Sequence, residues 1–260
     1  MILESLAHAR LWPLVAGAAA YLAGTWAVGL RLRAAAGALD VVLSPASTVM
    51  INLSGVLASH LTFGGPAGEA ARGLWLLRFT RQGRARVLAI LAVDRLADGL
   101  AIVGLALCAA GSHAGMAVAV APFVLAGISC VVLPRLVPLV GVRQLVRGAA
   151  RALPAALCVW VLDLARLALV ARALGLHLSL STLAGLALAA LIGGQAPTPA
   201  GVGAVEGAMV ATGVALGMTP ADALGLAVAD RTLSLTLGTL LGALASARLG
   251  TLTRRPPCTR

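Results

Sequence analysis

The chain contains no lysine, and it has few aromatic residues and few charges of either sign. Only 3% of its 260 residues are aromatic and 11% are charged, whereas 60% are hydrophobic. The small aromatic share argues against a base-stacking surface, so no nucleic-acid partner is expected despite the formal net charge of +11. A mean hydropathy of +0.98 lies far outside the range of soluble domains. The composition predicts a polytopic membrane protein.

Motifs of catalysis and of metal binding are missing as well. There is no HExxH, no GxSxG and no phosphate-binding loop. The four cysteines stand singly without CxxC spacing, so we expect no disulfide, metal or other cofactor. Asp94 and Asp98 are one helical turn apart, which is a poor arrangement for acid–base hydrolysis. The sequence therefore predicts a protein that is not an enzyme.

Apolar runs near the length needed to cross a bilayer recur along the chain. They cover residues 11–30, 87–108, 116–133 and 153–174. The run at the beginning is long and follows a segment that carries Glu4, so a cleavable signal peptide is not expected. These runs predict helices that span the membrane.

All twenty basic residues are arginine, and most lie between the apolar runs. Four fall within residues 78–86, four within residues 135–151 and three beyond Arg248. Such clusters are typical of cytoplasmic segments, which places the C-terminus inside. Within the second cluster, the arginines four residues apart share one face of a helix that could meet anionic lipid, although a plain loop fits equally well. They are Arg143, Arg147 and Arg151.

Two regions, residues 40–108 and 180–247, interrupt this pattern. Each has two short apolar arms around a break rich in Pro and Gly, and then a longer run with an Asp-Arg pair. The breaks are FGGPAGEAARG, which contains Pro66 and Glu69, and GGQAPTPAGVG, which precedes Glu206. At 1.5 Å per residue the short arms do not comfortably cross about 30 Å of hydrocarbon. We expect broken helices that meet near the midplane.

The spacings of the two regions match. Glu69 precedes Arg95 by 26 residues, and Glu206 precedes Arg231 by 25. Three long runs, 87–108, 116–133 and 153–174, lie between the first hairpin region, about residues 40–80, and the second, about residues 180–218, so the two regions enter the membrane from opposite sides. We interpret this as a duplication with inverted topology inside one membrane domain, residues 1–260, that ends in a basic cytoplasmic tail at 248–260. Transporters built on this plan place their site at the interface of the repeats.

Irregular backbone in a bilayer needs protein or water to satisfy its polar groups, so the second break is expected to line a cavity. Pro199 stops the preceding helix, and Gly201 and Gly203 permit unusual dihedrals. The helix that begins near Ala204 directs free N–H groups at the gap, which suits an anionic headgroup. The alternative is a simple kink in which Glu206 only complements the helix dipole.

Seven charged residues lie inside apolar runs, where an unpaired charge costs at least about 2.5–3.5 kcal/mol. They are Asp94, Arg95, Asp98, Asp163, Arg166, Asp230 and Arg231. Asp163 and Arg166 share a helix face and are expected to pair. Asp94 and Asp98 also share a face, and their like charges need a cation beside them.

Arg95 and Arg231 are the candidates for pairing with Glu69 and Glu206, within one region or across both. Whether the two arginines form structural ion pairs or contact substrate stays open, and the two roles are compatible. Asn52, on the first arm of the first break, is interpreted as a hydrogen-bonding partner of the opened backbone rather than a substrate contact.

The stretch PTPAGVGAVEGAMVATGVALGMTPADALGLAVADR resembles the C-terminal signature of the lysylphosphatidylglycerol synthase transmembrane (flippase-like) family. The matching residues are Pro197, Pro199, Gly201, Gly203, Glu206 and Arg231. An earlier stretch resembles the first half of the family at Asn52, Pro66, Gly68, Glu69, Arg72, Arg95 and Asp98. The resemblance implies about eight membrane segments that move or bind lipids. Without a soluble aminoacyl-transfer domain, synthesis of lysyl-lipid is not expected.

The sequence thus predicts an all-α polytopic membrane helix bundle, with two broken or re-entrant hairpins, in a bacterial or archaeal plasma membrane. Its function is predicted to be translocation of an anionic phospholipid or polyprenyl-linked lipid between leaflets. The alternatives are an ion-coupled transporter of a small solute and a non-transporting accessory subunit. Candidate partners are lipids with anionic headgroups, a second copy, or a lipid or glycan enzyme. The substrate-binding candidates are Glu69, Arg72, Arg95, Pro199, Gly201, Gly203, Glu206 and Arg231, supported by Asn52, Asp94, Asp98 and Asp230.

Overall fold

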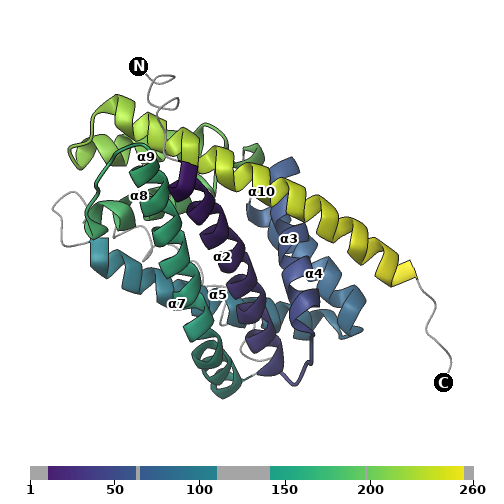
Figure 1. The fold of residues 1–260 in the computed structure, drawn as a ribbon. Helices are drawn as coiled ribbons and strands as arrows, with labels where there is room; N and C mark the ends of the chain where they lie inside the picture. Colours follow the sequence, from purple (N-terminus) through teal and green to yellow (C-terminus); the bar gives the residue numbers. More distant parts are fainter. Residues whose placement is uncertain (1–10, 63–64, 110–140, 197, 255–260) are drawn as a thin grey trace.

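The computed structural model describes residues 11–62, 65–109, 141–196 and 198–254. Within these ranges every regular element is helical (Figure 1). The elements are α2 (Leu11–Gly37), α3 (Pro45–Leu61), α4 (Gly65–Thr80), α5 (Arg84–Ala109), α7 (Val142–Ala173), α8 (Leu180–Gly193), η1 (Pro199–Gly201), α9 (Ala204–Ala215) and α10 (Pro220–Arg254). The all-α prediction is confirmed for these residues, and the run expected at 116–133 lies outside them.

Three of the described helices are long and apolar enough to cross a membrane: α2, α7 and α10 over Pro220–Leu252. At 1.5 Å per residue, the 27 residues of α2 and the 32 of α7 exceed the thickness of the hydrocarbon core. α5 has 26 residues but carries charges in its middle, so its burial in a membrane depends on partners for them. α8 is apolar and shorter, with 14 residues.

α7 begins earlier than the sequence suggests. Residues 142–151 were expected as a loop or a surface helix, but they form the first turns of α7. Arg143, Arg147 and Arg151 are exposed there, four residues apart on one face of the helix. The helix continues through Pro154 into the apolar run without interruption.

Two helical hairpins, α3–α4 and α8–α9, occupy the regions where broken helices were expected. Their first arms begin alike: Ser44 caps α3 by accepting from the Ser47 backbone N–H, and Ser179 caps α8 by accepting from that of Thr182, both at 3.1 Å. The first break is shorter than expected, because Pro66 is tolerated in the first turn of α4. Glu69 therefore lies on regular helix rather than on irregular backbone.

The second break has the irregular backbone that was expected. It runs from the end of α8 through η1 to Gly203, and Ala200, Gly201 and Gly203 have φ values of 55°, 69° and 82°. Only glycine adopts such values without strain, so the two glycines suit this turn and Ala200 needs support from its neighbours. η1 lies against α3, which brings the second break onto the first hairpin.

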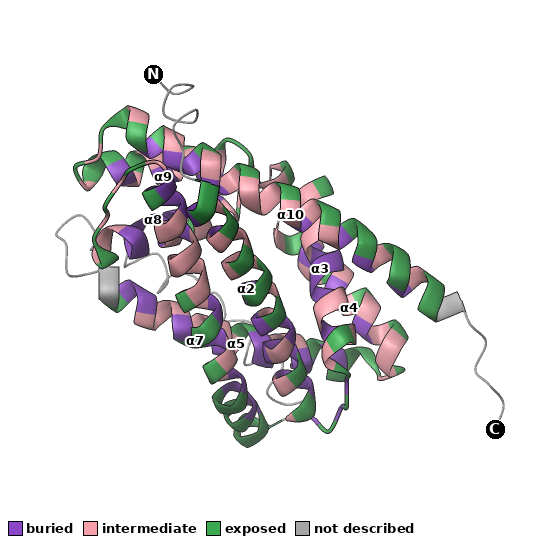
Figure 2. Ribbon diagram, in the orientation of Figure 1, coloured by how far each residue is buried: buried purple, intermediate pink, exposed green. Residues whose placement is uncertain are grey.

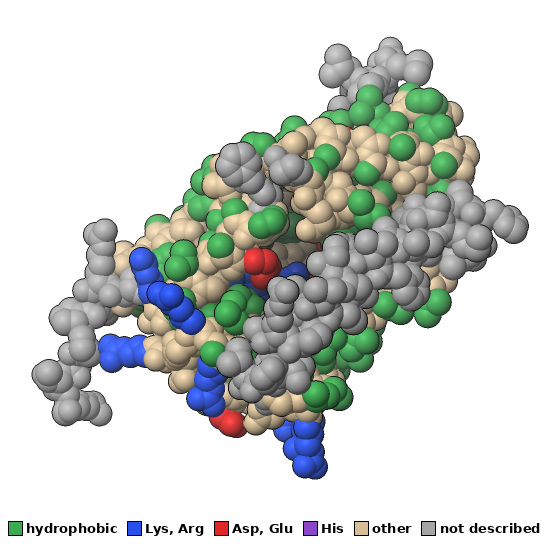
Figure 3. Space-filling model, turned by 180° about the vertical axis from the view of Figure 1, so that it is seen from behind, with side chains coloured by type: hydrophobic (Ala, Val, Ile, Leu, Met, Phe, Trp, Pro, Cys, Tyr) green, Lys and Arg blue, Asp and Glu red, His purple; other side chains and the backbone are tan. Residues whose placement is uncertain are grey.

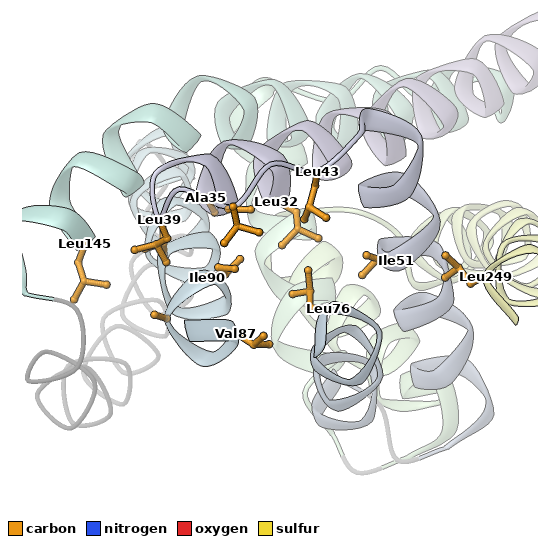
Figure 4. Close-up of a cluster of buried hydrophobic side chains, with 14 residues drawn as sticks. Leu32, Ala35, Leu39, Leu43, Ile51, Leu76, Val87, Ile90, Leu145 and Leu249 are labelled. Carbon is orange, nitrogen blue, oxygen red and sulfur yellow. The ribbon is translucent and has the colours of Figure 1, made fainter. Parts of the chain in front are cut away.

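One apolar cluster gathers at the end of the molecule where α2 ends and α3, α5 and α7 begin (Figure 4). It includes Val87 from α5, Leu145 from α7 and Leu249 from α10, so the arginine-rich ends of these helices lie together. A second cluster joins the end of α7 to α8, α9 and the beginning of α10. Buried residues face the contacts between helices, and exposed ones, many apolar, cover the outside (Figure 2).

α10 packs on α3 through two of its glycines. A Cβ atom at Gly242 would lie 2.7 Å from the Leu53 carbonyl oxygen and 2.8 Å from the Leu57 Cβ. At Gly238 it would meet the Tyr21 hydroxyl at 2.7 Å. Small residues of this kind let the backbones of membrane helices approach closely. His60 of α3 adds a hydrogen bond of 3.0 Å to Thr239 of α10.

We predict that Gly242→Ala destabilises the protein by about 1–3 kcal/mol, because the methyl group pushes α10 away from α3. Thermal unfolding in detergent measures the effect. Gly225→Ala is the matched control on the same helix, because a Cβ there meets nothing within 4 Å and alanine favours a helix. Equal melting temperatures for the two variants would contradict this packing.

Candidate functional site

Asp94, in the middle of α5, is fully buried and surrounded by arginines. Arg31 of α2 donates to it from Nε at 2.9 Å, Arg72 of α4 at 3.0 Å, and Arg95 at 3.2 Å. Arg31 and Arg72 are themselves 2% and 3% exposed. One carboxylate thus ties together three helices, and the favourable pairing offsets the cost of burying these charges.

Glu69 and Asp98 complete this group. Glu69 accepts from Arg72 at 2.9 Å and pairs with Arg95 at 3.1 Å. Asp98 accepts from Arg31 and, at 3.1 Å, from Arg95. We call the six residues Arg31, Glu69, Arg72, Asp94, Arg95 and Asp98 the first charge cluster. Its three arginines and three carboxylates balance.

Gly55 and Gly68 make room for Arg72 between the arms of the first hairpin. A Cβ atom at Gly55 would lie 2.5 Å from the Arg72 Cγ, and one at Gly68 would lie 2.8 Å from the Gly55 carbonyl oxygen. The glycines therefore let α3 and α4 approach while the long guanidinium side chain passes between them toward α5.

A cavity of about 320 Å³ opens beside the first charge cluster. Its polar lining includes Arg31, Asn52, Glu69, Arg72, Arg95, Asp98, Trp160 and Asp163. The side chains of Glu69 and Arg95 are 37% and 42% exposed, the most open charges of the cluster. Three of the predicted substrate-binding residues, Glu69, Arg72 and Arg95, line this cavity, and their binding of substrate stays a prediction. Asn52 faces this cavity rather than an opened backbone.

The second half of the chain contains a smaller group of charges. Arg166 of α7 pairs with Asp230 of α10 at 3.1 Å and with Asp163 of its own helix at 3.4 Å. The pairing of Asp163 with Arg166 was expected from their spacing. The Arg166 guanidinium also lies over the Tyr21 ring, 5.9 Å from its centroid. A second cavity, of about 160 Å³, adjoins this group.

Arg231 holds the second break in place. It donates from Nε to the Glu206 carboxylate at 3.3 Å and from Nη2 to the Ala200 carbonyl oxygen. Glu206 in turn accepts from the Gly203 backbone N–H at 2.7 Å. The free end of α9 is therefore capped by the chain's own carboxylate, as in the dipole alternative, and the strained Ala200 gains the support it needs.

The second break was expected to line a cavity, but its described residues contribute to neither of the two cavities above. Glu206 and Arg231 are not among the described residues that line either cavity, and neither are Pro199, Gly201 and Gly203. At the second break Arg231 instead contacts the Glu206 carboxylate and the Ala200 carbonyl oxygen. Each glutamate pairs with the arginine of its own half, Glu69 with Arg95 and Glu206 with Arg231.

Sequence reasoning missed Arg31 and Trp160. Arg31 directly follows the apolar run 11–30, a position typical of a cytoplasmic connection, but it is buried inside α2 and contacts two aspartates of α5. Trp160 of α7 donates from Nε1 to Asp98 at 3.2 Å. A signal for Arg31 existed: it precedes Asp94 by 63 residues, and Arg166 precedes Asp230 by 64.

The described residues thus define a helical membrane protein whose charged side chains pair around a polar cavity. The model of one family, the lysylphosphatidylglycerol synthase TM region, matches residues 1–242. The match covers most of the chain, so the protein belongs to this family, and the resemblance seen in its motifs is confirmed. Neither a curated protein nor a solved structure matched the chain.

Asp94→Asn is predicted to destabilise the protein by about 3–5 kcal/mol, because it leaves the two buried guanidinium groups of Arg31 and Arg72 short of a counter-charge. Glu69→Gln, in a half-exposed pair, costs less than about 1 kcal/mol. Unfolding of the two variants in the same detergent compares them. Similar losses would show that the cluster is not organised around Asp94.

Proposed function

We propose that this protein translocates a lipid between the leaflets, with the headgroup passing through the larger cavity while the acyl chains stay in the bilayer. The supporting observation is this cavity of about 320 Å³, lined by three arginines, among helices whose outer surface is apolar. The family match supports a membrane protein connected with lipids. We further propose that the protein acts as a transporter and not as an enzyme.

The charge balance of the first cluster limits how an anionic headgroup binds. All three arginines already have carboxylate partners, so a phosphate gains a guanidinium only by displacing one of them. Glu69 is the partner to be displaced, because it is the most exposed carboxylate of the cluster and Arg95 its most exposed arginine. Phosphate and carboxylate use the same guanidinium hydrogen bonds, so the exchange leaves Arg95 paired.

Access from the side suits a lipid. Figure 3 shows acidic and basic side chains in a hollow of one face, among hydrophobic and uncharged side chains, while arginines gather toward one end. An opening on such a face lets a headgroup enter without pulling the acyl chains out of the hydrocarbon. We propose that the arginine-rich end is cytoplasmic, with the C-terminus on the same side.

We also propose that the two halves are an inverted repeat, with about eight membrane segments in all. Support comes from the matched order of contacts: in each half a serine-capped hairpin precedes a helix whose Asp-Arg pair binds an arginine from an earlier helix and a glutamate from the hairpin. Rocking of one half against the other then exposes the cavity to the two leaflets in turn.

The two alternatives differ in what they require. A non-transporting accessory subunit needs closed ion pairs without a cavity, so the observed cavity favours transport. An ion-coupled transporter of a soluble solute needs a site closed to the bilayer, and the charged hollow in Figure 3 favours a lipid. Homo-oligomers or a partner lipid or glycan enzyme remain compatible with lipid transport.

Reconstituted vesicles with fluorescent lipids and dithionite quenching test this proposal. We predict protein-dependent movement of an anionic phospholipid that Arg95→Gln slows at least about tenfold, because the loss of charge-assisted hydrogen bonds costs about 1.5–3 kcal/mol. Glu69→Gln is expected to act in the opposite direction, raising the preference for anionic over zwitterionic lipid.

The control is Arg78→Gln, which removes an exposed arginine at the end of α4 that stacks over Trp75 at 5.4 Å and does not line the cavity. Its rate should equal that of the wild type. No movement above protein-free vesicles for any headgroup would reject lipid translocation. An equal loss of transport rate in Arg95→Gln and Arg78→Gln would show that the lipid headgroup does not pass through the cavity.

A further inference from the structure

The two halves differ in their charge balance. Asp94 of the first half has three arginines, and its cluster is neutral. In the second half Asp163 and Asp230 share Arg166, and Glu206 takes Arg231. Two arginines thus face three carboxylates. An unbalanced charge is costly inside a membrane protein. The second half can therefore take up one additional positive charge, whereas the charges of the first cluster already balance.

Asp230 is the carboxylate beside which an additional positive charge would bind. Its side chain is 6% exposed, and its Oδ1 atom is buried without any hydrogen bond in the described part of the chain. The Arg166 guanidinium lies 3.1 Å from this oxygen, but it is shared with Asp163. The smaller cavity, about 160 Å³ in volume, is lined by Asp163, Arg166 and Asp230. A ligand of this site therefore meets a carboxylate oxygen that is free to accept a hydrogen bond or a proton.

A proton fits this site better than a metal ion. The rest of the cavity wall comes from Trp160, Leu167, Ala187, Ala190, Leu191 and Met209, which offer no oxygen ligands from their side chains. Ca²⁺ takes six to eight oxygens, and Mg²⁺ needs an octahedral set. Within the described residues no three His, Cys, Asp or Glu side chains gather for a metal. One proton on one carboxylate needs no further ligand.

The groups that face Asp163 and Asp230 come from four helices. They are Tyr21 and Arg31 of α2, Asp98 of α5, Arg166 of α7 and Arg231 of α10. α8 and α9 contribute only apolar side chains to the cavity wall. The like charges of Asp163 and Asp230 around one guanidinium favour a state in which the pair holds one proton.

We propose that Asp163 and Asp230 together bind one exchangeable proton, and that this proton couples lipid movement to the pH gradient. The coupling rests on the proposed lipid transport, whereas proton binding does not. Asp163 and Trp160 line both cavities, so the proton site and the headgroup cavity share a wall. The proton enters through the larger cavity at Asp163, whose side chain is 38% exposed, and passes to the buried carboxylate of Asp230.

Proton binding is tested on the full-length protein in lipid vesicles by infrared difference spectroscopy. The stretching band of a protonated carboxyl group should be present at mildly acidic pH and disappear at alkaline pH. Asp230→Asn and Asp163→Asn should each abolish this band. Asp222→Asn, which alters an exposed carboxylate bonded to Thr219, should leave it unchanged. Either substitution balances the charges of the second half, and Asp163→Asn, at the more exposed carboxylate, is the variant expected to fold.

Coupling is tested in the same vesicles with an imposed pH gradient. Lipid movement in the wild type should change by up to about tenfold per pH unit, the ratio of proton activities, and Asp163→Asn should lose this response. If the carboxyl band titrates but no lipid moves, the proton site is supported and lipid transport is rejected. Lipid movement with no titrating band, or with a band that both variants retain, overturns the proton site alone.

Discussion

The structure depends on one constraint, that a charge inside a membrane protein must have a partner. Asp94 meets it through Arg31, Arg72 and Arg95, which reach it from α2, α4 and α5 itself. These contacts hold the first hairpin against two long helices, and glycines on α3, α4 and α10 permit the close packing around them. The charges that make α5 a poor membrane helix by composition are therefore the ones that fix its place in the bundle.

The same constraint links the fold to transport. Where the pairs are complete and half-exposed, as at Glu69 and Arg95, they line a cavity, and we propose that a phosphate there takes the place of a carboxylate. Where the pair also binds backbone, as Arg231 does at Ala200, it lines neither of the two cavities. We propose that the two halves exchange these roles during transport, because their contacts follow the same order along the chain. The structure then represents one of two alternating states.

Much of this organisation could be predicted from the sequence. The Pro/Gly breaks indicated where the hairpins lie, and the Asp-Arg pairs indicated the partners of both glutamates. The spacing of Asp163 and Arg166 predicted their ion pair. Arg31 was missed because arginine at the end of an apolar run usually marks a cytoplasmic loop. The sequence could not indicate which ion pair borders a cavity, because motif order does not show which pair is open. Such openness depends on helix packing, which no local pattern records.

The central claim, that a lipid headgroup occupies the larger cavity, is tested most directly by photo-crosslinking. A photoreactive amino acid placed at Val56, which lines the cavity, is compared with one at Leu240, which is 59% exposed on α10. After irradiation in vesicles, mass spectrometry locates the attached lipid fragment. The account predicts headgroup fragments at Val56 and acyl-chain fragments at Leu240. Acyl chains at both positions, or no lipid at Val56, would contradict it.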